Sequence, residues 1–115
     1  MNAIILKYLN LKIFSEQDII DYCLLNDINP DDIIYLDLSI NELTDITGIK
    51  LFKNLEHLYL ESNNISDISV LKNLKKLENL GLQNNGLTDI SVLKYLKKLN
   101  ALFLNNNNIT DIYLF

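Results

Sequence analysis

The sequence lacks arginine and tryptophan, and its 115 residues include one cysteine, one proline, one histidine and three glycines. Because Cys23 has no second cysteine to pair with, an internal disulfide is excluded. One histidine and one cysteine cannot supply a zinc site. The three glycines, Gly48, Gly81 and Gly86, lie too far apart to form a phosphate-binding loop. These absences predict a chain that holds no metal and no cofactor.

Candidates for catalysis are equally few. A nucleophile, a base and an orienting group must be in contact to form a catalytic triad. We expect Cys23 inside an N-terminal helical segment and His57 on an open strand, so the two side chains should not meet. The sequence therefore predicts that the protein is not an enzyme.

The charge is negative, at −5 overall, and it is unevenly distributed. Residues 1–45 carry two lysines and nine acids (2 − 9 = −7), whereas residues 46–115 carry eight lysines and six acids (8 − 6 = +2). An acidic chain without arginine is a poor partner for nucleic acid. The apolar runs are too short to predict a membrane span. With no basic leader before a long apolar stretch, we expect a cytoplasmic protein.

What the sequence does contain is a period. Asn41, Asn63, Asn85 and Asn107 stand 22 residues apart. Around them runs one frame, Leu-x-x-Leu-x-Leu-x-x-Asn-x-Leu, with isoleucine in some positions, which begins at Ile33, Leu55, Leu77 and Leu99. This frame resembles the 22-residue class of leucine-rich repeat, which is found in bacterial internalins and in a eukaryotic phosphatase regulatory subunit.

The resemblance implies an α/β solenoid in which a parallel sheet lines the concave face and short helical turns lie on the convex face. Four strands should span about 14 Å. Each asparagine should satisfy loop backbone groups, so that the four side chains form a ladder. The aspartates 45, 67, 89 and 111 precede the convex turns and are placed to cap them. We therefore expect one domain: a helical N-terminal cap at 1–32 and four leucine-rich repeats at 33–115.

Within the cap, Ser15 and Asp18 form a capping-box pattern that predicts a helix over about 16–26. Its apolar side should carry Ile19, Ile20, Cys23 and Leu24. The apolar spacing over residues 2–10 also predicts a short helix.

The side chains that alternate with the inward leucines should be exposed on the concave face. The resemblance implies that this face binds a partner protein. Exposed aromatic side chains on a rigid sheet are typical of binding hot spots, although aromatics also favour strands for their own sake. The predicted partner-binding residues are Tyr35, Asp37, His57, Tyr59, Glu61 and Phe103. We expect the aromatics to act as anchors, and we expect Asp37 and Glu61 to favour a basic segment of the partner. The protein would then act as a small inhibitor, immunity factor or adaptor.

Two other features leave alternatives open. Lysines repeat at the same period on the convex half, at 50, 72 and 94, at 53, 75 and 97, and at 76 and 98. They form either a solvated face or an electrostatic patch for an acidic partner or for membrane lipid headgroups. At the C-terminal end the flank of the last repeat is open. Either Tyr113, Leu114 and Phe115 fold over it, or they join two copies in a homodimer, or a partner protein covers it.

Overall fold

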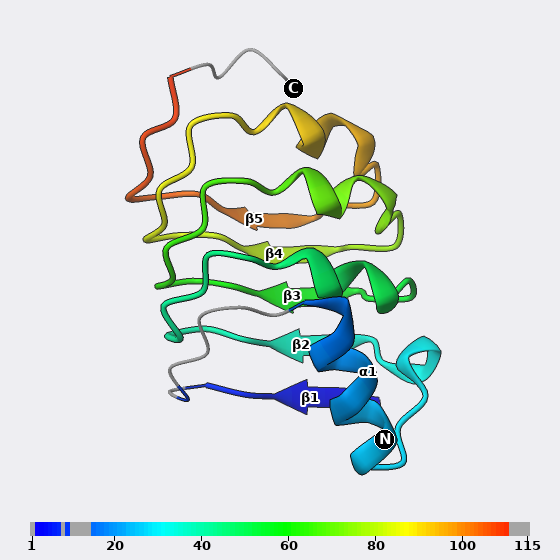
Figure 1. Ribbon diagram of the computed structural model, residues 1–115. Coiled ribbons are helices and arrows are strands. Elements are labelled where there is room, and N and C mark those ends of the chain that lie inside the picture. The colour runs from blue at the N-terminus through cyan, green and yellow to red at the C-terminus, as the bar shows by residue number, and fades with distance from the viewer. Residues whose placement is uncertain (1, 8, 10–14, 111–115) are drawn as a thin grey trace.

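The molecule is a short solenoid with a five-stranded parallel sheet along one side, as the computed structural model in Figure 1 shows. The structure describes residues 2–7, 9 and 15–110. The strands are β1 (Ala3–Ile5), β2 (Tyr35–Asp37), β3 (His57–Tyr59), β4 (Asn79–Gly81) and β5 (Ala101–Phe103). They pair in sequence order, and all four pairings are parallel.

On the other side of the solenoid lie a helix and a set of 3₁₀ turns. The helix is α1 (Glu16–Leu25), and a first 3₁₀ turn, η1 (Pro30–Asp32), leads into β2. The repeats contribute η2 (Thr47–Leu51), η3 (Ser69–Asn73) and η4 (Ser91–Tyr95). A 22-residue unit leaves room for one such turn only, as the repeat length predicts.

The core is a column of leucine and isoleucine side chains between the sheet and the 3₁₀ turns. Each strand turns its central leucine inward, and Leu36, Leu58 and Leu80 are fully buried. The turns contribute Ile49 and Leu71 from the opposite side. At about 1.5–3 kcal/mol for each fully buried aliphatic side chain, this column supplies most of the favourable free energy of folding.

The asparagine ladder is confirmed. Asn85 accepts a hydrogen bond at Oδ1 from the backbone nitrogen of Ile65 at 3.0 Å. Its Nδ2 donates to the carbonyl oxygens of Leu60 at 3.0 Å and of Leu82 at 3.1 Å. One side chain therefore satisfies backbone groups of two consecutive repeats, and the same pattern recurs at Asn107.

The aspartates before the 3₁₀ turns bond to the start of each turn as expected, although they stand one residue before the N-cap positions Ile46, Ile68 and Ile90. The carboxylates of Asp45, Asp67 and Asp89 accept hydrogen bonds from backbone nitrogens two residues ahead, each at 2.9 Å. Asp111 lies outside the described residues. These bonds fix the entry into each turn, because they satisfy a donor that the turn itself leaves unpaired.

The prediction for residues 2–10 is wrong in the part that the structure describes. Ala3–Ile5 forms strand β1, which pairs with β2 so that Ile4 lies beside Leu36. The sheet consequently has five strands, not the four that the repeats alone predict. The physical reason is tertiary: without β1, the first repeat would present an unpaired strand edge. The N-terminal cap is therefore a strand followed by a helix.

Helix α1 is confirmed, and its buried side is narrower than predicted. Ser15 and Asp18 form the expected capping box. Ile19 and Cys23 are buried against the first repeat, where α1 contacts η2. Ile20 and Leu24 are exposed. Because η2 is short, it contacts only one row of side chains on α1.

Candidate functional site

The exposed face of the sheet, hereafter the sheet face, is built from rows of side chains in register. The central row runs Ile5, Asp37, Tyr59, Gly81, Phe103, one residue from each strand. The row beside it includes Tyr35, His57 and Asn79. Each member lies about 4.8 Å from the next, because that is the spacing of paired strands. Glu61 and Gln83 continue the face just beyond β3 and β4.

Three of the predicted anchors form one aromatic cluster. The ring centroid of Tyr35 lies 5.5 Å from that of Tyr59 and 5.9 Å from that of His57, with tilted planes. Such tilted pairs add about 0.5–1.5 kcal/mol beyond the area they bury. His57 Nδ1 also lies 2.6 Å from Nδ2 of Asn79. The cluster is therefore held in place before any partner arrives.

Tyr59 is partly buried and lies beside two acidic side chains. Burial raises the pKa of the Tyr59 hydroxyl, and the neighbouring Tyr35, Glu61 and Asp37 raise it further. The hydroxyl therefore stays protonated at neutral pH and offers a hydrogen-bond donor. Phe103, two strands away, is 48% exposed and extends the apolar surface.

Asp37 lies in the outward row that the sequence predicts, but its side chain is buried there. The side chain is expected to be exposed, yet the residue is only 5% exposed. Its Oδ1 accepts hydrogen bonds from Ser39 Oγ at 2.7 Å and from the Ser39 backbone at 3.0 Å, and Lys7 Nζ lies 3.4 Å from Oδ2. A buried carboxylate needs such partners, so Asp37 supplies charge from beneath the surface, partly offset by Lys7.

Comparisons with known proteins agree with this architecture. A family described as "Leucine Rich repeats (2 copies)" matches residues 33–73 and 75–114. The chain belongs to the leucine-rich-repeat family. No curated protein matches it.

Solved structures place this leucine-rich-repeat protein beside the internalins. Internalin C2 from Listeria monocytogenes is 32% identical over 72% of the chain, with a TM-score of 0.70. A second internalin from that species is 42% identical over 72% of the chain, also with a TM-score of 0.70. A leucine-rich-repeat protein from Leptospira interrogans is 25% identical over 90% of the chain, with a TM-score of 0.69. The chain spans 37%, 25% and 31% of the lengths of these three proteins.

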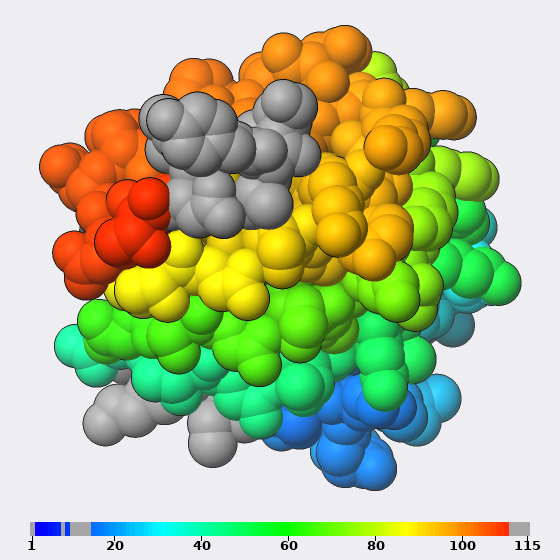
Figure 2. All heavy atoms as spheres, turned by 90° about the horizontal axis from the view of Figure 1, so that it is seen from above, coloured from blue at the N-terminus to red at the C-terminus, as the bar shows by residue number. Residues whose placement is uncertain are grey.

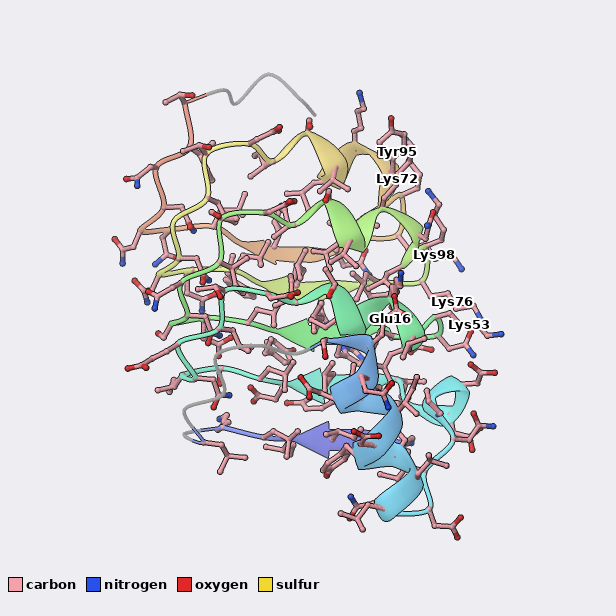
Figure 3. The ribbon with its side chains drawn as sticks, in the orientation of Figure 1. Glu16, Lys53, Lys72, Lys76, Tyr95 and Lys98 are labelled. Atoms are coloured by element: carbon pink, nitrogen blue, oxygen red, sulfur yellow. The ribbon has the colours of Figure 1, made fainter. Side chains whose placement is uncertain are left out.

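The lysine rows of this leucine-rich-repeat protein divide into two groups. Lys50 pairs with Glu16 of α1, and Lys53 lies 3.4 Å from Asp31 of η1, so both tie the cap to the first repeat. Three of the later lysines lie around Tyr95, as Figure 3 shows for Lys72. The side-chain nitrogens of Lys72, Lys75 and Lys94 lie 5.0, 5.1 and 5.3 Å from the centroid of its ring. This flank is positive, and the sheet face is not.

The end of the solenoid at the fourth repeat keeps apolar side chains partly accessible. Leu102 and Leu104 are half-buried, whereas the equivalent Leu80 and Leu82 one repeat earlier are fully buried. Figure 2 views the molecule from this end, where residues of the fourth repeat appear in orange. Tyr113, Leu114 and Phe115, the predicted dimer contacts, lie outside the described residues.

Two negative findings apply to residues 2–7, 9 and 15–110. Within them, no cluster of three or more histidine, cysteine or acidic side chains is arranged to hold a metal ion. Their one α-helix, α1, is too short to cross a bilayer. Cys23 and His57 lie on α1 and β3, and nothing in this part of the chain brings them together as a nucleophile and its base.

The sequence did not point to three residues of the sheet face. Ile5 is 61% exposed beside Asp37, although the apolar spacing of residues 2–10 predicts a helix there. Alternation predicts that Gly81 and Gln83 face outward, but it gives no reason to single them out. The available signal was the period itself: Gly81 occupies the position that holds Tyr59 in the repeat before and Phe103 in the repeat after. A missing side chain between two aromatics marks a place where something else can fit.

Proposed function

We propose that this leucine-rich-repeat protein is a non-catalytic module that binds a partner protein through its sheet face. The proposed contacts are Tyr35, Asp37, His57, Tyr59, Glu61 and Phe103. The observation that carries the proposal is the aromatic cluster of Tyr35, His57 and Tyr59, which stands preorganised on a rigid sheet. Preorganised aromatics lose little entropy on binding, and this is why they dominate hot spots.

The size of the sheet face limits the kind of complex. Five strands at about 4.8 Å span roughly 19 Å, which suits a standard contact of about 800 Å² on each partner. Such an area is enough for one compact target. A small inhibitor, an immunity factor or an adaptor would need no more. A cytoplasmic location belongs to the same proposal, since a chain with one cysteine gains no disulfide from an oxidising compartment.

The test compares two double variants in affinity capture and then with the purified partner. Tyr59→Ala with Phe103→Ala removes two anchors from the sheet face. Lys72→Ala with Lys97→Ala is the control, because it truncates the same number of side chains on the flank that carries the lysines. The proposal expects one protein to be retained by wild type and by the lysine variant, and to bind the aromatic variant at least about thirtyfold more weakly.

Folding must be checked in both variants by circular dichroism and by the midpoint of urea unfolding. If a natively folded Tyr59→Ala, Phe103→Ala protein keeps its partner at full strength, the sheet face is not the binding surface. Loss of the partner in the lysine variant alone would move the interface to the lysine flank.

A second candidate is self-association through the end formed by the fourth repeat. What favours it is the partial exposure of Leu102 and Leu104, because apolar surface at the end of a solenoid is stabilised when something covers it. Light scattering over a wide range of protein concentration decides the matter. Mass that rises with concentration supports a dimer, and a constant monomer mass rejects it.

A further inference from the structure

Gly81 lies at the centre of the sheet face, between Tyr59 on β3 and Phe103 on β5. Three side-chain atoms occupy the space that a Cβ on this residue would need. They are Glu61 Oε2 at 3.1 Å, Tyr59 Cδ1 at 3.2 Å and Gln83 Oε1 at 3.3 Å from the position of that Cβ. The glycine therefore leaves a shallow recess about the size of a methyl group, and the Tyr59 ring and two oxygen atoms line it closely.

Both oxygen atoms are buried without a hydrogen-bond partner among the described residues. A carboxylate and an amide oxygen are acceptors only, so neither can satisfy the other in this arrangement. Burying an acceptor without a donor is unfavourable, and more so when the group is charged. What the recess lacks is a donor.

The charge of the recess is also unbalanced. Asp37 has Lys7 at 3.4 Å, whereas Glu61 forms no ion pair with any residue that the structure describes. Among the described outward positions and those just beyond the strands, only Lys7 is a lysine, and its ammonium lies beside Asp37. A cation would therefore meet an uncompensated carboxylate in a partly dehydrated place, where electrostatic attraction is stronger than in water.

The flanking rings set the shape of the missing group. Tyr59 and Phe103 stand two strand spacings apart, which is about 9.6 Å between backbones. A flat group in van der Waals contact with a ring on each side needs about 7–8 Å between the ring planes. Tyr59 Cδ1 already lies 3.2 Å from the Cβ position of Gly81, so a planar cation would lie over Gly81 on the Phe103 side of the Tyr59 ring, with cation–π attraction to a ring on either side.

Resting on the proposed function, we propose that Glu61, Gln83 and the recess at Gly81 receive the guanidinium of an arginine side chain presented by the partner protein. The guanidinium is planar and carries five donors in a fixed fork, so it can donate to Glu61 and Gln83 at once while it lies between the rings. A lysine ammonium would reach the carboxylate, but it has no flat face to place between Tyr59 and Phe103.

The experiment titrates the folded, ¹⁵N-labelled protein with three peptides and follows the spectrum by NMR. The probes are acetyl-Gly-Gly-Arg-Gly-Gly-amide and the same peptide with lysine or citrulline in place of arginine. Citrulline keeps the shape and loses the charge. The arginine peptide should shift the Gly81 backbone amide and the Gln83 side-chain amide. The lysine peptide should bind about tenfold more weakly, and the citrulline peptide more weakly still.

Two variants and one matched control locate the effect. Glu61→Gln keeps the size and removes the charge, and it should weaken the arginine peptide by about tenfold or more. Gly81→Ala fills the recess and should cost a similar factor of about ten. Because Gly81 does not have a positive φ, alanine fits the strand and the fold should survive.

Gly86→Ala is the control, because the same substitution there meets only the Ile65 carbonyl oxygen, at 3.8 Å. This variant should bind the arginine peptide as wild type does. Equal weakening in both alanine variants would overturn the proposal, since it would show a general effect of replacing glycine.

Three further results would overturn the proposal. The first is equal binding of the arginine and lysine peptides with shifts spread over the acidic surface. The second is an absence of shifts at Gly81. The third concerns the orientation of the Gln83 amide. If its oxygen and nitrogen are exchanged, so that the amide nitrogen already donates to Glu61 in the free protein, the recess does not lack a donor. If the Tyr59→Ala, Phe103→Ala variant still loses its partner in these cases, the proposed function stands and only the arginine site fails.

Discussion

The side-chain oxygen of Asn63 lies 3.0 Å from the backbone nitrogen of Asn41, which occupies the same position one repeat earlier. The same oxygen accepts from Leu43 at 2.9 Å, and Asn63 Nδ2 donates to the Leu38 carbonyl at 3.1 Å. One side chain thus closes its own loop and the loop of its neighbour. The asparagines therefore couple the repeats, in addition to shaping each turn.

Replacing one of these asparagines should lower the stability of the whole solenoid. Asn85→Ala leaves the Ile65 nitrogen without its side-chain partner, and it removes one of the two asparagine donors at each of the Leu60 and Leu82 carbonyls. The expected loss is about 1–3 kcal/mol in the free energy of unfolding, measured with urea. Asn64→Ala is the control: its side chain is exposed, so the change should stay within about 0.5 kcal/mol. Similar losses in both variants would contradict the coupling role.

A different prediction follows from the backbone at Ile40. Its φ is +60°, as are those of Asn84 and Asn106 at the same position of later repeats. A β-branched side chain is strained in this region, whereas asparagine tolerates it. Ile40→Asn should therefore stabilise the protein by about 1 kcal/mol, visible as a higher urea midpoint. The reverse change, Asn84→Ile, should destabilise it by a similar amount. A loss of stability in Ile40→Asn would mean that side-chain contacts of Ile40 outweigh the strain.

These cases show which parts of the molecule the sequence could predict. The period determined the four repeat strands, the 3₁₀ turns and the asparagine ladder, because identical local rules act 22 residues apart. The period could not predict β1, because β1 lies outside the repeats and its residues fit two patterns. Ile4 and Leu6 alternate as in a strand, whereas Ile4, Ile5 and Leu9 have the spacing of a helix. Only the open edge of β2 decides between them. That edge is a property of the assembled sheet.

The sheet face shows the same division. Alternation along the strands placed Tyr59 and Phe103 outward correctly. It placed Asp37 outward too, although Ser39 and Lys7 hold that carboxylate down. The recess at Gly81 depends on which neighbouring side chains lean over it. Such directions are set by packing between repeats, on which a single sequence carries no direct information.

The aspartates before the 3₁₀ turns predict a pH dependence. Hydrogen bonds from the Ser69 backbone and hydroxyl lower the pKa of Asp67, and Asp45 and Asp89 are lowered in the same way by Thr47 and Ser91. A depressed pKa stabilises the fold above the unfolded value of about 3.8. That contribution is lost as the pH falls through the folded pKa. Stability should therefore fall on acidification below the usual aspartate range.

Urea unfolding at several pH values checks this dependence. Changing the three aspartates together to asparagine keeps an acceptor oxygen at each turn and removes the titration. The triple variant should show a flatter dependence of the unfolding free energy on pH in the acidic range. An unchanged slope would assign the acid sensitivity to other carboxylates.

Cys23 offers a probe of how the N-terminal cap opens. The thiol is 3% exposed, and burial raises its pKa, so both effects should slow alkylation by iodoacetamide in the folded protein. Helix α1 covers one end of the solenoid and contacts η2, whereas an inner repeat is packed on both sides. Units with a single neighbour are the least stable in such arrays. Alkylation should therefore begin at a lower urea concentration than the loss of circular dichroism.

The matched control moves the thiol one residue along the same helix. In Cys23→Ala with Leu24→Cys, the thiol replaces a side chain that is 77% exposed, so it should react at the rate of the unfolded chain without urea. Because both thiols share one helix, a difference between them reports burial and not the reagent. If Cys23 became reactive only as the circular dichroism signal disappeared, the cap and the repeats would unfold as one cooperative unit. The cap would then be as stable as the inner repeats, although it contacts a neighbour on one side only.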